Sequence, residues 1–395
     1  MEKHRLIVLG GGYTGIVVAG QLARRIRPDE ASVTLVTDHA TRDERMRWHQ
    51  LATGQQYPLL SIADALKGSG AQLTVAHVER IDLEERAVIP AGEEALHYDS
   101  LVIALGSVID FGTVPGAREH AHGLTDVESI RVTAKQLEAA PDESQIVVVG
   151  GGLTGIELAT EVAESYPRLN VTIASAHAAG DWLSEPGRRY LGRAFDRLSV
   201  EQIVGRVTRI EEDCLVLADG REISSTLTLW AGGFRANPIM AAAGLSVDEL
   251  GRARVDATFR SISHRDVWVI GDAARVPGPD GVPLKMGCRT GAFMAIGAPR
   301  KMAEELTGVA AKPFAGRYFA ECISLGRHDA LLQWLTADGA ATNRIITGRP
   351  ALFMKEYVHR GNLVVASHPG PYAPVRRTHV RPAVGAGHRP VNDIS

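Results

Sequence analysis

Cysteine is scarce in this chain. Only three of its 395 residues are cysteines, Cys214, Cys288 and Cys322, and they are too widely spaced for CxxC redox chemistry or for a zinc site. The chain therefore lacks a thiol pair a few residues apart, which disulfide reduction requires. The low cysteine content favours a reducing, cytoplasmic setting.

A strong charge bias and long apolar runs are also lacking. The net charge is −3, so no basic field recommends nucleic acid as a partner. The 14 histidines are scattered without an HExxH pattern, so we expect no metal site. Beyond the uncharged N-terminal stretch no run is long enough to span a bilayer, and Pro369 to Ser395 has no amphipathic repeat. We therefore expect membrane contact to be peripheral at most.

The chain does contain one glycine-rich pattern twice, as GGGYTGIVVAGQLA from Gly10 to Ala23 and as GGGLTGIELATEVA from Gly150 to Ala163. Each copy follows a short apolar run and leads into a segment with helical apolar spacing. Strand, glycine turn and helix form the context in which G-x-G-x-x-G indicates dinucleotide binding. Two copies predict two dinucleotide cofactors. The internal copy also shows that the N-terminal stretch is structural and not a signal peptide.

Each glycine of the pattern has a predicted task. The first, Gly10 or Gly150, makes the tight turn, and the second, Gly12 or Gly152, lets the backbone approach a pyrophosphate. The third lets the helix pack closely on the strand, and the first helical N–H groups bind the phosphates. The remaining predicted residues of these two cradles are Tyr13, Thr14, Gly15, Leu153, Thr154 and Gly155.

The order of apolar segments predicts an α/β fold. A second β-rich run follows each glycine pattern and its helix, at 32–37 and at 170–175, so each unit reads β-α-β with parallel strands. Alternating polarity from Leu73 to Ile89 predicts antiparallel strands. Further strands end in small residues at Ala104-Leu105-Gly106, Gly232-Gly233 and Gly271-Asp272.

Together, these strand-end motifs and the two cradles resemble the two-dinucleotide-binding-domain flavoproteins of the pyridine nucleotide-disulfide oxidoreductase superfamily. Within it, the chain is most similar to type II NADH:quinone oxidoreductases and to the ferroptosis-suppressor, apoptosis-inducing-factor-like quinone reductases. The likeness covers about residues 4–360. It rests on GGGLTGIELATEVAE (150–164), LWAGGFRANP (229–238), VIGDAA (269–274), HQLATG (49–54) and SLGRHDALLQW (324–334).

The resemblance implies that the first cradle holds FAD and the second NADH or NADPH. It implies two Rossmann-like domains, an FAD domain of residues 1–115 and 256–307 interrupted by an NAD(P)H domain of residues 116–255. An α+β C-terminal region is expected at 308–368, and a disordered tail at 369–395. Asp272 is expected to accept a hydrogen bond from FAD hydroxyls, with a helix N-cap as the alternative role.

An acid at the end of each unit's second strand is expected to accept ribose hydroxyls. In the first unit the candidate is Asp38, one place after Thr37. The second unit reads Ser175-Ala176-His177 and has no acid there. Because a carboxylate would repel a 2′-phosphate and His177 can attract one, the sequence leaves both NADH and NADPH open.

The resemblance further implies hydride transfer from NAD(P)H to flavin and electron transfer to a quinone-like acceptor, with the flavin carrying the chemistry. Glu157 is expected near the contact between nicotinamide and flavin, or else is an ordinary helix residue paired with solvent. Lys285 and Arg289 match the region beside the flavin, where a cation stabilises negative charge, or else are surface charges. The group from Arg45 to His49 is expected beside the flavin or on a solvated helix face.

Two other functions stay open on this sequence. The chain could deliver electrons to a small protein, as a ferredoxin-type reductase does. It could also be an apoptosis-inducing-factor-like redox sensor that binds both cofactors and turns over slowly. A homodimer is likewise left open.

Overall fold

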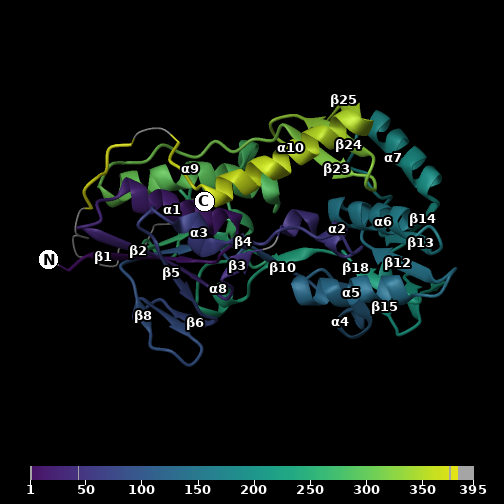
Figure 1. Ribbon diagram of the computed structural model, residues 1–395, viewed down its shortest axis with the longest axis horizontal. Helices are drawn as coiled ribbons and strands as arrows, with labels where there is room; N and C mark the ends of the chain where they lie inside the picture. The colour runs from purple at the N-terminus through teal and green to yellow at the C-terminus, as the bar shows by residue number, and fades with distance from the viewer. Residues whose placement is uncertain (1, 43, 373–374, 381–395) are drawn as a thin grey trace.

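The computed structural model describes residues 2–42, 44–372 and 375–380. Two lobes lie side by side in Figure 1, each built on a five-stranded sheet. All pairings in the first sheet are parallel, and its strand order is β21-β9-β1-β2-β5. The strands are β1 (His4–Leu9), β2 (Ala31–Thr37), β5 (Gln72–Val75), β9 (Ser100–Ile103) and β21 (Val267–Val269).

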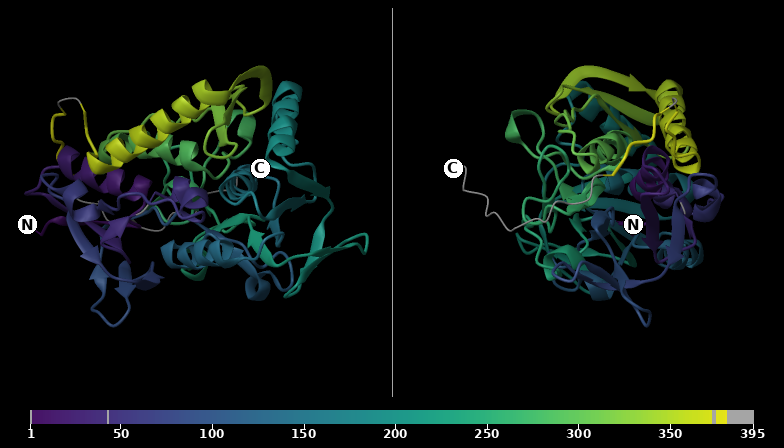
Figure 2. Two further views of the ribbon diagram at one scale, coloured as in Figure 1. Left: turned by 45° about the vertical axis from the view of Figure 1, so that its right-hand side comes forward. Right: turned by 90° about the vertical axis from the view of Figure 1, so that its left-hand side faces the viewer.

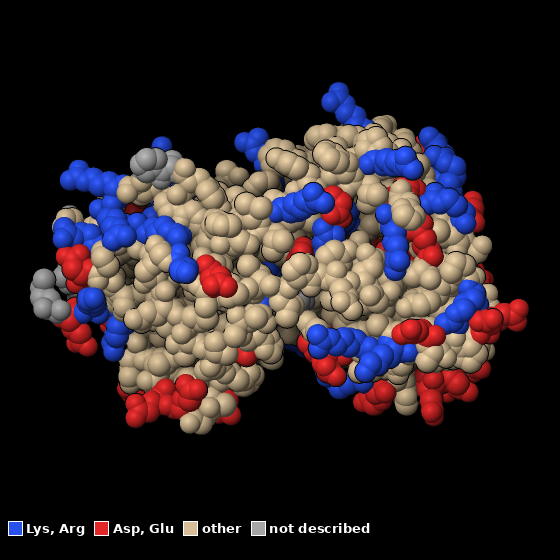
Figure 3. All heavy atoms as spheres, in the orientation of Figure 1, with Lys and Arg blue, Asp and Glu red and all other residues tan. Residues whose placement is uncertain are grey.

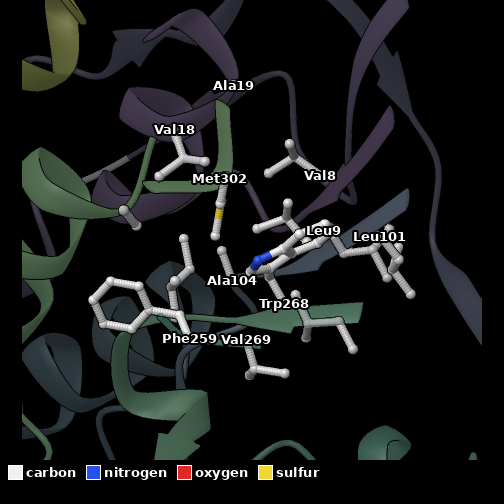
Figure 4. Packing of buried hydrophobic residues seen from close by; sticks show 14 of the residues in the cluster. Val8, Leu9, Val18, Ala19, Leu101, Ala104, Phe259, Trp268, Val269 and Met302 are labelled. Atoms are coloured by element: carbon white, nitrogen blue, oxygen red, sulfur yellow. The ribbon is translucent and has the colours of Figure 1, made fainter. Parts of the chain in front are cut away.

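The first sheet is a buried parallel sheet because its central strands are continuous apolar runs. Leu6 to Leu9 and Leu101 to Ile103 are all buried, as expected for strands covered on both faces. The helices of this unit include α1 (Tyr13–Arg25), α3 (Ile62–Leu66) and α9 (Cys288–Leu306). Figure 4 shows Trp268 of β21 packed among side chains of the sheet and Met302 of α9.

The second sheet repeats the plan with the order β11-β18-β12-β13-β14, again with every pairing parallel. Its strands are β11 (Ala121–Gly123), β12 (Gln145–Val149), β13 (Asn170–Ser175), β14 (Val200–Val204) and β18 (Leu227–Trp230). The helices of this unit are α4 (Ala117–His120), α5 (Val127–Ala139), α6 (Leu153–Ser165) and α7 (Glu185–Leu198). Together the two sheets confirm the predicted α/β fold with two Rossmann-like units.

Small antiparallel sheets complete both units. They are formed by β6 (Val78–Asp82), β7 (Ala87–Pro90) and β8 (Leu96–His97), and by β15 (Val207–Ile210), β16 (Cys214–Leu217) and β17 (Glu222–Ser224). The expected antiparallel run from Leu73 is wrong at its start, because β5 pairs parallel with β2. It forms one edge of the first sheet.

The remaining elements before the C-terminal region are short. They are β3 (Thr41–Arg42), β4 (Leu60–Ser61), η1 (Arg45–Arg47), α2 (Trp48–Leu51), β10 (Ser107–Ile109), β19 (Phe234–Ala236), α8 (Ile239–Ala242), β20 (Ala253–Arg254), β22 (Ala274–Arg275), η2 (Gly271–Ala273) and η3 (Pro279–Gly281). The antiparallel pair of β10 and β19 ties the two halves of the chain together. The domain boundaries given above stay a prediction.

The C-terminal region adds a three-stranded antiparallel sheet of β23 (Ala320–Ser324), β24 (Ala330–Leu335) and β25 (Ala341–Thr347), followed by α10 (Gly348–Ser367). In Figures 1 and 2, α10 runs from this sheet back across the first unit, where it contacts α1 and α3. Within the described residues no helix is both long and apolar enough to cross a membrane. The expected disordered tail falls largely outside the described residues.

Candidate functional site

In the first cradle, which follows β1, neighbouring atoms leave room for a side chain only at Gly12, the second glycine of the G-x-G-x-x-G pattern. Gly10 has φ +107°, and a Cβ there would lie 2.5 Å from the Ala104 carbonyl oxygen. A Cβ on Gly15 would lie 1.9 Å from the Gly10 carbonyl oxygen, so α1 must start against bare backbone. At Gly12 a Cβ would meet nothing within 4 Å. The open face at Gly12 is therefore where a ligand can approach the backbone.

The second cradle has the same steric pattern. Gly150 has φ +125°, and a Cβ there would lie 2.3 Å from the Ala231 carbonyl oxygen. A Cβ on Gly155 would lie 1.8 Å from the Gly150 carbonyl oxygen, whereas one on Gly152 would meet nothing within 4 Å. Both turns thus present an open second glycine beside the N-terminus of a 13-residue helix. The binding roles of these glycines stay a prediction.

A cavity of about 680 Å³ opens at the first cradle. This volume lies within the roughly 300–1,000 Å³ typical of small-molecule and cofactor sites. Of the predicted cofactor residues, Gly10, Gly12, Asp38, Ala104 and Gly106 line it, and Arg42, Arg45, Trp48 and His77 line it as well. The guanidinium of Arg42 stacks on the Tyr13 ring at 3.3 Å. Basic side chains beside an open helix N-terminus fit a diphosphate, and so the site fits the ADP half of FAD.

Asp272 links three parts of the first unit. Its Oδ2 accepts a hydrogen bond from Ser107 Oγ at 2.8 Å, and its Oδ1 accepts one from the Gly287 amide at 2.7 Å. The N-cap alternative is wrong for η2, because Ile270 is the N-cap and Asp272 lies inside the turn. The carboxylate instead holds the residue that precedes α9 against β10. Its neighbour Gly271 packs on Thr14 of α1, where a Cβ would lie 3.4 Å from Thr14 Oγ1.

Lys285 and Arg289 take different positions. Lys285 is exposed, and its backbone amide donates to the Tyr318 hydroxyl at 2.6 Å. Arg289 lies in the first turn of α9, and its Nη1 is buried with no hydrogen-bond partner among the described residues. The small void around it is lined by Leu284, Thr290, Phe293, Phe314, Gly316, Arg317 and Tyr318. Arg289 thus offers an unpaired donor inside a largely apolar, aromatic pocket.

Glu157 of α6 lies in a buried polar cluster and not in solvent. Its Oε1 accepts hydrogen bonds from Lys355 Nζ of α10 and, at 3.1 and 3.3 Å, from the Ser324 amide and hydroxyl. Lys355 Nζ also donates to Ser324 Oγ at 2.8 Å. His49 completes the cluster, with Nε2 3.1 Å from Ser324 Oγ and Nδ1 3.9 Å from Glu157 Oε2. The alternative of a solvent-paired helix residue is therefore wrong, and a contact of Glu157 with the cofactors stays a prediction.

Burial and charge set the protonation states of this cluster. Burial alone would raise the pKa of Glu157, but the charges of Lys355 and His49 and the hydrogen bonds from Lys355 and Ser324 together outweigh it and lower the pKa to about 2. Burial lowers the pKa of His49 to about 4 and that of His359, one turn beyond Lys355, to about 3. Near neutral pH the cluster therefore holds an ionised carboxylate and two neutral imidazoles.

The sequence missed two members of this cluster. Ser324 opens one of the stretches that carried the resemblance, and that membership was the available signal. Lys355 lies 198 positions from Glu157, and no local motif marks it. The residues from Arg45 to His49 lie in two different places. Arg45 and Trp48 line the first-cradle cavity. Arg47 is buried and forms ion pairs with Glu44 and Glu356.

The nucleotide end of the second cradle is made by the end of β13. Ser175 is buried, and its Oγ donates to the His177 carbonyl oxygen at 2.6 Å, which turns the chain sharply and leaves His177 exposed. On the other side of the cradle a Cβ on Gly232 would lie 2.4 Å from the Trp230 ring, and Gly233 has φ +149°. Figure 3 shows that acidic and basic side chains are scattered over both lobes on the face that it draws.

Three comparisons with known proteins bear on this site. The family model for pyridine nucleotide-disulphide oxidoreductases matches residues 4–290. A type II NADH:quinone oxidoreductase of Staphylococcus haemolyticus is 26% identical over 395 residues, covering 90% of this chain and 94% of the relative. The fold resembles the sulfide:quinone oxidoreductase of Aquifex aeolicus at TM-score 0.78 with 20% identity and 93% of each chain covered. It also resembles NDH2 from Plasmodium falciparum in complex with NADH at TM-score 0.75 with 13% identity, covering 93% of this chain and 98% of that one.

Proposed function

The chain belongs to the pyridine nucleotide-disulphide oxidoreductase family, and we propose that it is an FAD-dependent enzyme that takes a hydride from NADH or NADPH and passes electrons to a quinone. The observation that carries this proposal is the pair of matched cradles, each with an open second glycine beside a helix N-terminus. The name of the Staphylococcus haemolyticus relative supports NADH as donor and quinone as acceptor.

The first cradle is the FAD site in this proposal. The N-terminal amides of α1 and the cations of Arg42 and Arg45 face a diphosphate, and Asp38 faces the ribose of the adenosine. Asp272 holds the start of α9 against β10 and has further lone pairs for FAD hydroxyls. Bound FAD supplies the hydride acceptor and the one- or two-electron return to the second substrate.

The buried cluster at Glu157 supplies protons and position. Reduction of a quinone to a quinol adds two electrons and two protons, and in this proposal a buried donor supplies one of these protons and solvent supplies the other. The Lys355 ammonium, held by Glu157 and Ser324, is such a donor at Nζ. Because the pKa of Glu157 is lowered to about 2, its carboxylate stays ionised near neutral pH and accepts the hydrogen bond from Lys355.

The pocket around Arg289 is the proposed acceptor site. The void there holds about 10 Å³, so a quinone ring enters only if side chains such as the partly exposed Phe293 move aside. The residues around it are largely apolar and aromatic, and the buried Nη1 of Arg289 is then available to a quinone oxygen as negative charge develops. We place the enzyme in the cytoplasm with membrane contact at most peripheral, and a homodimer stays a prediction.

Anaerobic stopped-flow spectroscopy tests the proposal. NADH or NADPH should bleach the flavin of the purified protein, and a menadione-type quinone should reoxidise it faster than oxygen or ferredoxin does. Arg289→Ala should slow quinone reduction at least about tenfold, close to 1.4 kcal/mol, while flavin reduction keeps its rate. Arg300→Ala, which removes an exposed arginine paired with Glu304 on the same helix, is the matched control. A flavin that no quinone reoxidises faster than oxygen would favour the ferredoxin or sensor function.

A further inference from the structure

The two cradles can be aligned residue by residue from their own geometry. A Cβ on Gly11 would lie 2.6 Å from Thr37 Oγ1, and a Cβ on Gly151 would lie 2.7 Å from Ser175 Oγ. Thr37 and Ser175 thus occupy the same position at the end of the second strand of each unit. The next residue is Asp38 in the first unit, and Ala176 stands in its place in the second.

The neighbouring strand gives a second pair of matched positions. The Ala76 amide donates to the Thr37 carbonyl oxygen at 2.8 Å, and the Gly205 amide donates to the Ser175 carbonyl oxygen at 2.9 Å. The residues that follow are His77 in the first unit and Arg206 in the second. His77 lines the first-cradle cavity together with Asp38 and Gly12. The same topology brings Arg206 to the nucleotide end of the second cradle.

The charges at this end of the second cradle favour an anion. Ala176, His177 and Arg206 are all exposed, and within the described part of the chain Arg206 forms no salt bridge. The neighbouring Arg221 is neutralised by Asp219 at 2.8 Å and donates to the Val204 carbonyl oxygen. The next acid along the chain after His177 is Asp181, whose side chain is exposed.

At the end of the second strand a ribose 2′-hydroxyl is best met by an acidic side chain, and a 2′-phosphate by a basic one. A carboxylate at the end of the second strand accepts a hydrogen bond from the 2′-hydroxyl of NADH and repels the 2′-phosphate of NADPH. An arginine at this place instead binds the phosphate through charge-assisted hydrogen bonds. The second cradle has alanine where the acid would stand and an arginine on the adjoining strand. We infer that NADPH is the preferred nucleotide of the second cradle, with Arg206 and His177 recognising its 2′-phosphate. This inference rests on the proposed function, in which that cradle holds the hydride donor.

Steady-state kinetics of the flavin-loaded protein test the preference. Wild type should show a higher kcat/KM for NADPH than for NADH. Arg206→Ala should lower kcat/KM for NADPH at least about tenfold, equal to about 1.4 kcal/mol, and leave that for NADH within about twofold. Ala176→Asp should shift the ratio toward NADH by about a hundredfold. Arg209→Ala removes an arginine three positions on that is paired with Glu211, and it should change neither value.

A binding measurement separates this inference from the proposed function. In calorimetry, 2′,5′-ADP should bind wild type at least about tenfold more tightly than 5′-AMP does, and Arg206→Ala should abolish the difference. This difference needs no hydride transfer, so it can hold even if no nucleotide bleaches the flavin, in which case only the proposed function fails. Rapid flavin reduction by NADH with equal binding of 2′,5′-ADP and 5′-AMP would overturn the inference and leave the proposed function standing.

Discussion

The two glycine cradles share a backbone and differ in the side chains around it. At the turn they are sterically equivalent, since Gly10 and Gly15 face the same restrictions as Gly150 and Gly155. Two residues after the third glycine of the pattern they diverge, because Val17 of α1 is buried hydrocarbon where α6 carries Glu157. The glycines thus determine how a dinucleotide backbone can be approached, and the positions beside them determine what each unit does with it.

The difference between Val17 and Glu157 follows from what covers each helix. The helix α1 packs against α9, α10 and the first sheet, and Val17 is a buried apolar residue on it. The helix α6 packs against the C-terminal sheet, which supplies Ser324, and α10 supplies Lys355. A carboxylate is stable inside the protein only where a cation and hydrogen-bond donors meet it. The C-terminal region is therefore what allows the second unit to carry a buried charge.

Substitution of the open glycines should separate the two cradles most strongly. Gly12→Val should yield mostly colourless protein, because the side chain would occupy the space that a pyrophosphate needs. Gly152→Val should keep its flavin but lose reduction by NADH and NADPH. Neither new side chain is forced into a clash, since a Cβ at either position meets nothing within 4 Å. Flavin absorbance and stopped-flow bleaching measure the two effects, and full flavin occupancy in Gly12→Val would contradict the assignment of the first cradle.

Removal of the cation that meets Glu157 should have the next largest effect. Lys355→Met leaves an ionised carboxylate buried without its partner, which costs about 3–5 kcal/mol of unfolding free energy. The double variant Glu157→Gln with Lys355→Met removes that charge and should recover part of the loss. Denaturant unfolding of the flavin-loaded protein measures both. Equal stability of the single and double variants would show that Glu157 does not depend on Lys355.

The buried histidines should make the molecule sensitive to mild acid. Because the folded-state pKa values of His49 and His359, about 4 and 3, lie below the usual 6.5, the unfolded chain takes up more protons between these limits. The free energy of unfolding therefore keeps its full value above about pH 6.5. Below that pH it falls by about 1.4 kcal/mol per pH unit for each histidine. Glu157 adds a further loss below about pH 4.5, since its pKa is also lowered. The pH dependence of unfolding should be shallower in His49→Gln and His359→Gln variants.

Much of this molecule could be predicted from sequence, because glycine patterns and apolar runs are local signals. The family and the fold class are confirmed, and the expected β-rich run at 170–175 is the strand β13 of the structure. The meeting of Glu157 with Lys355 could not be predicted, since it depends on how α10 folds back over the molecule. The match between Asp38 and Ala176 also needed structure, because the exact register of each strand end is set by a close contact between a glycine and a side chain.

Removal of all thiols should have the smallest effect, and it tests whether anything other than bound flavin carries electrons between the two cradles. Cys288 begins α9 close to the Asp272 loop, and Cys322 lies on β23, two positions before Ser324. Cys288 is exposed and Cys322 is partly buried, but the loss of solvent around both thiols raises their pKa values, so they stay protonated and weakly nucleophilic near neutral pH. Cys214, on β16, donates weakly to Glu211 at 3.5 Å.

The triple variant Cys214→Ser, Cys288→Ser, Cys322→Ser should therefore keep its nicotinamide oxidation rate within about tenfold, since no thiol has an assigned covalent step. Cys214→Ser alone serves as the control. Loss of flavin reduction in the triple variant, with flavin content and folding intact, would establish a thiol step between the cradles.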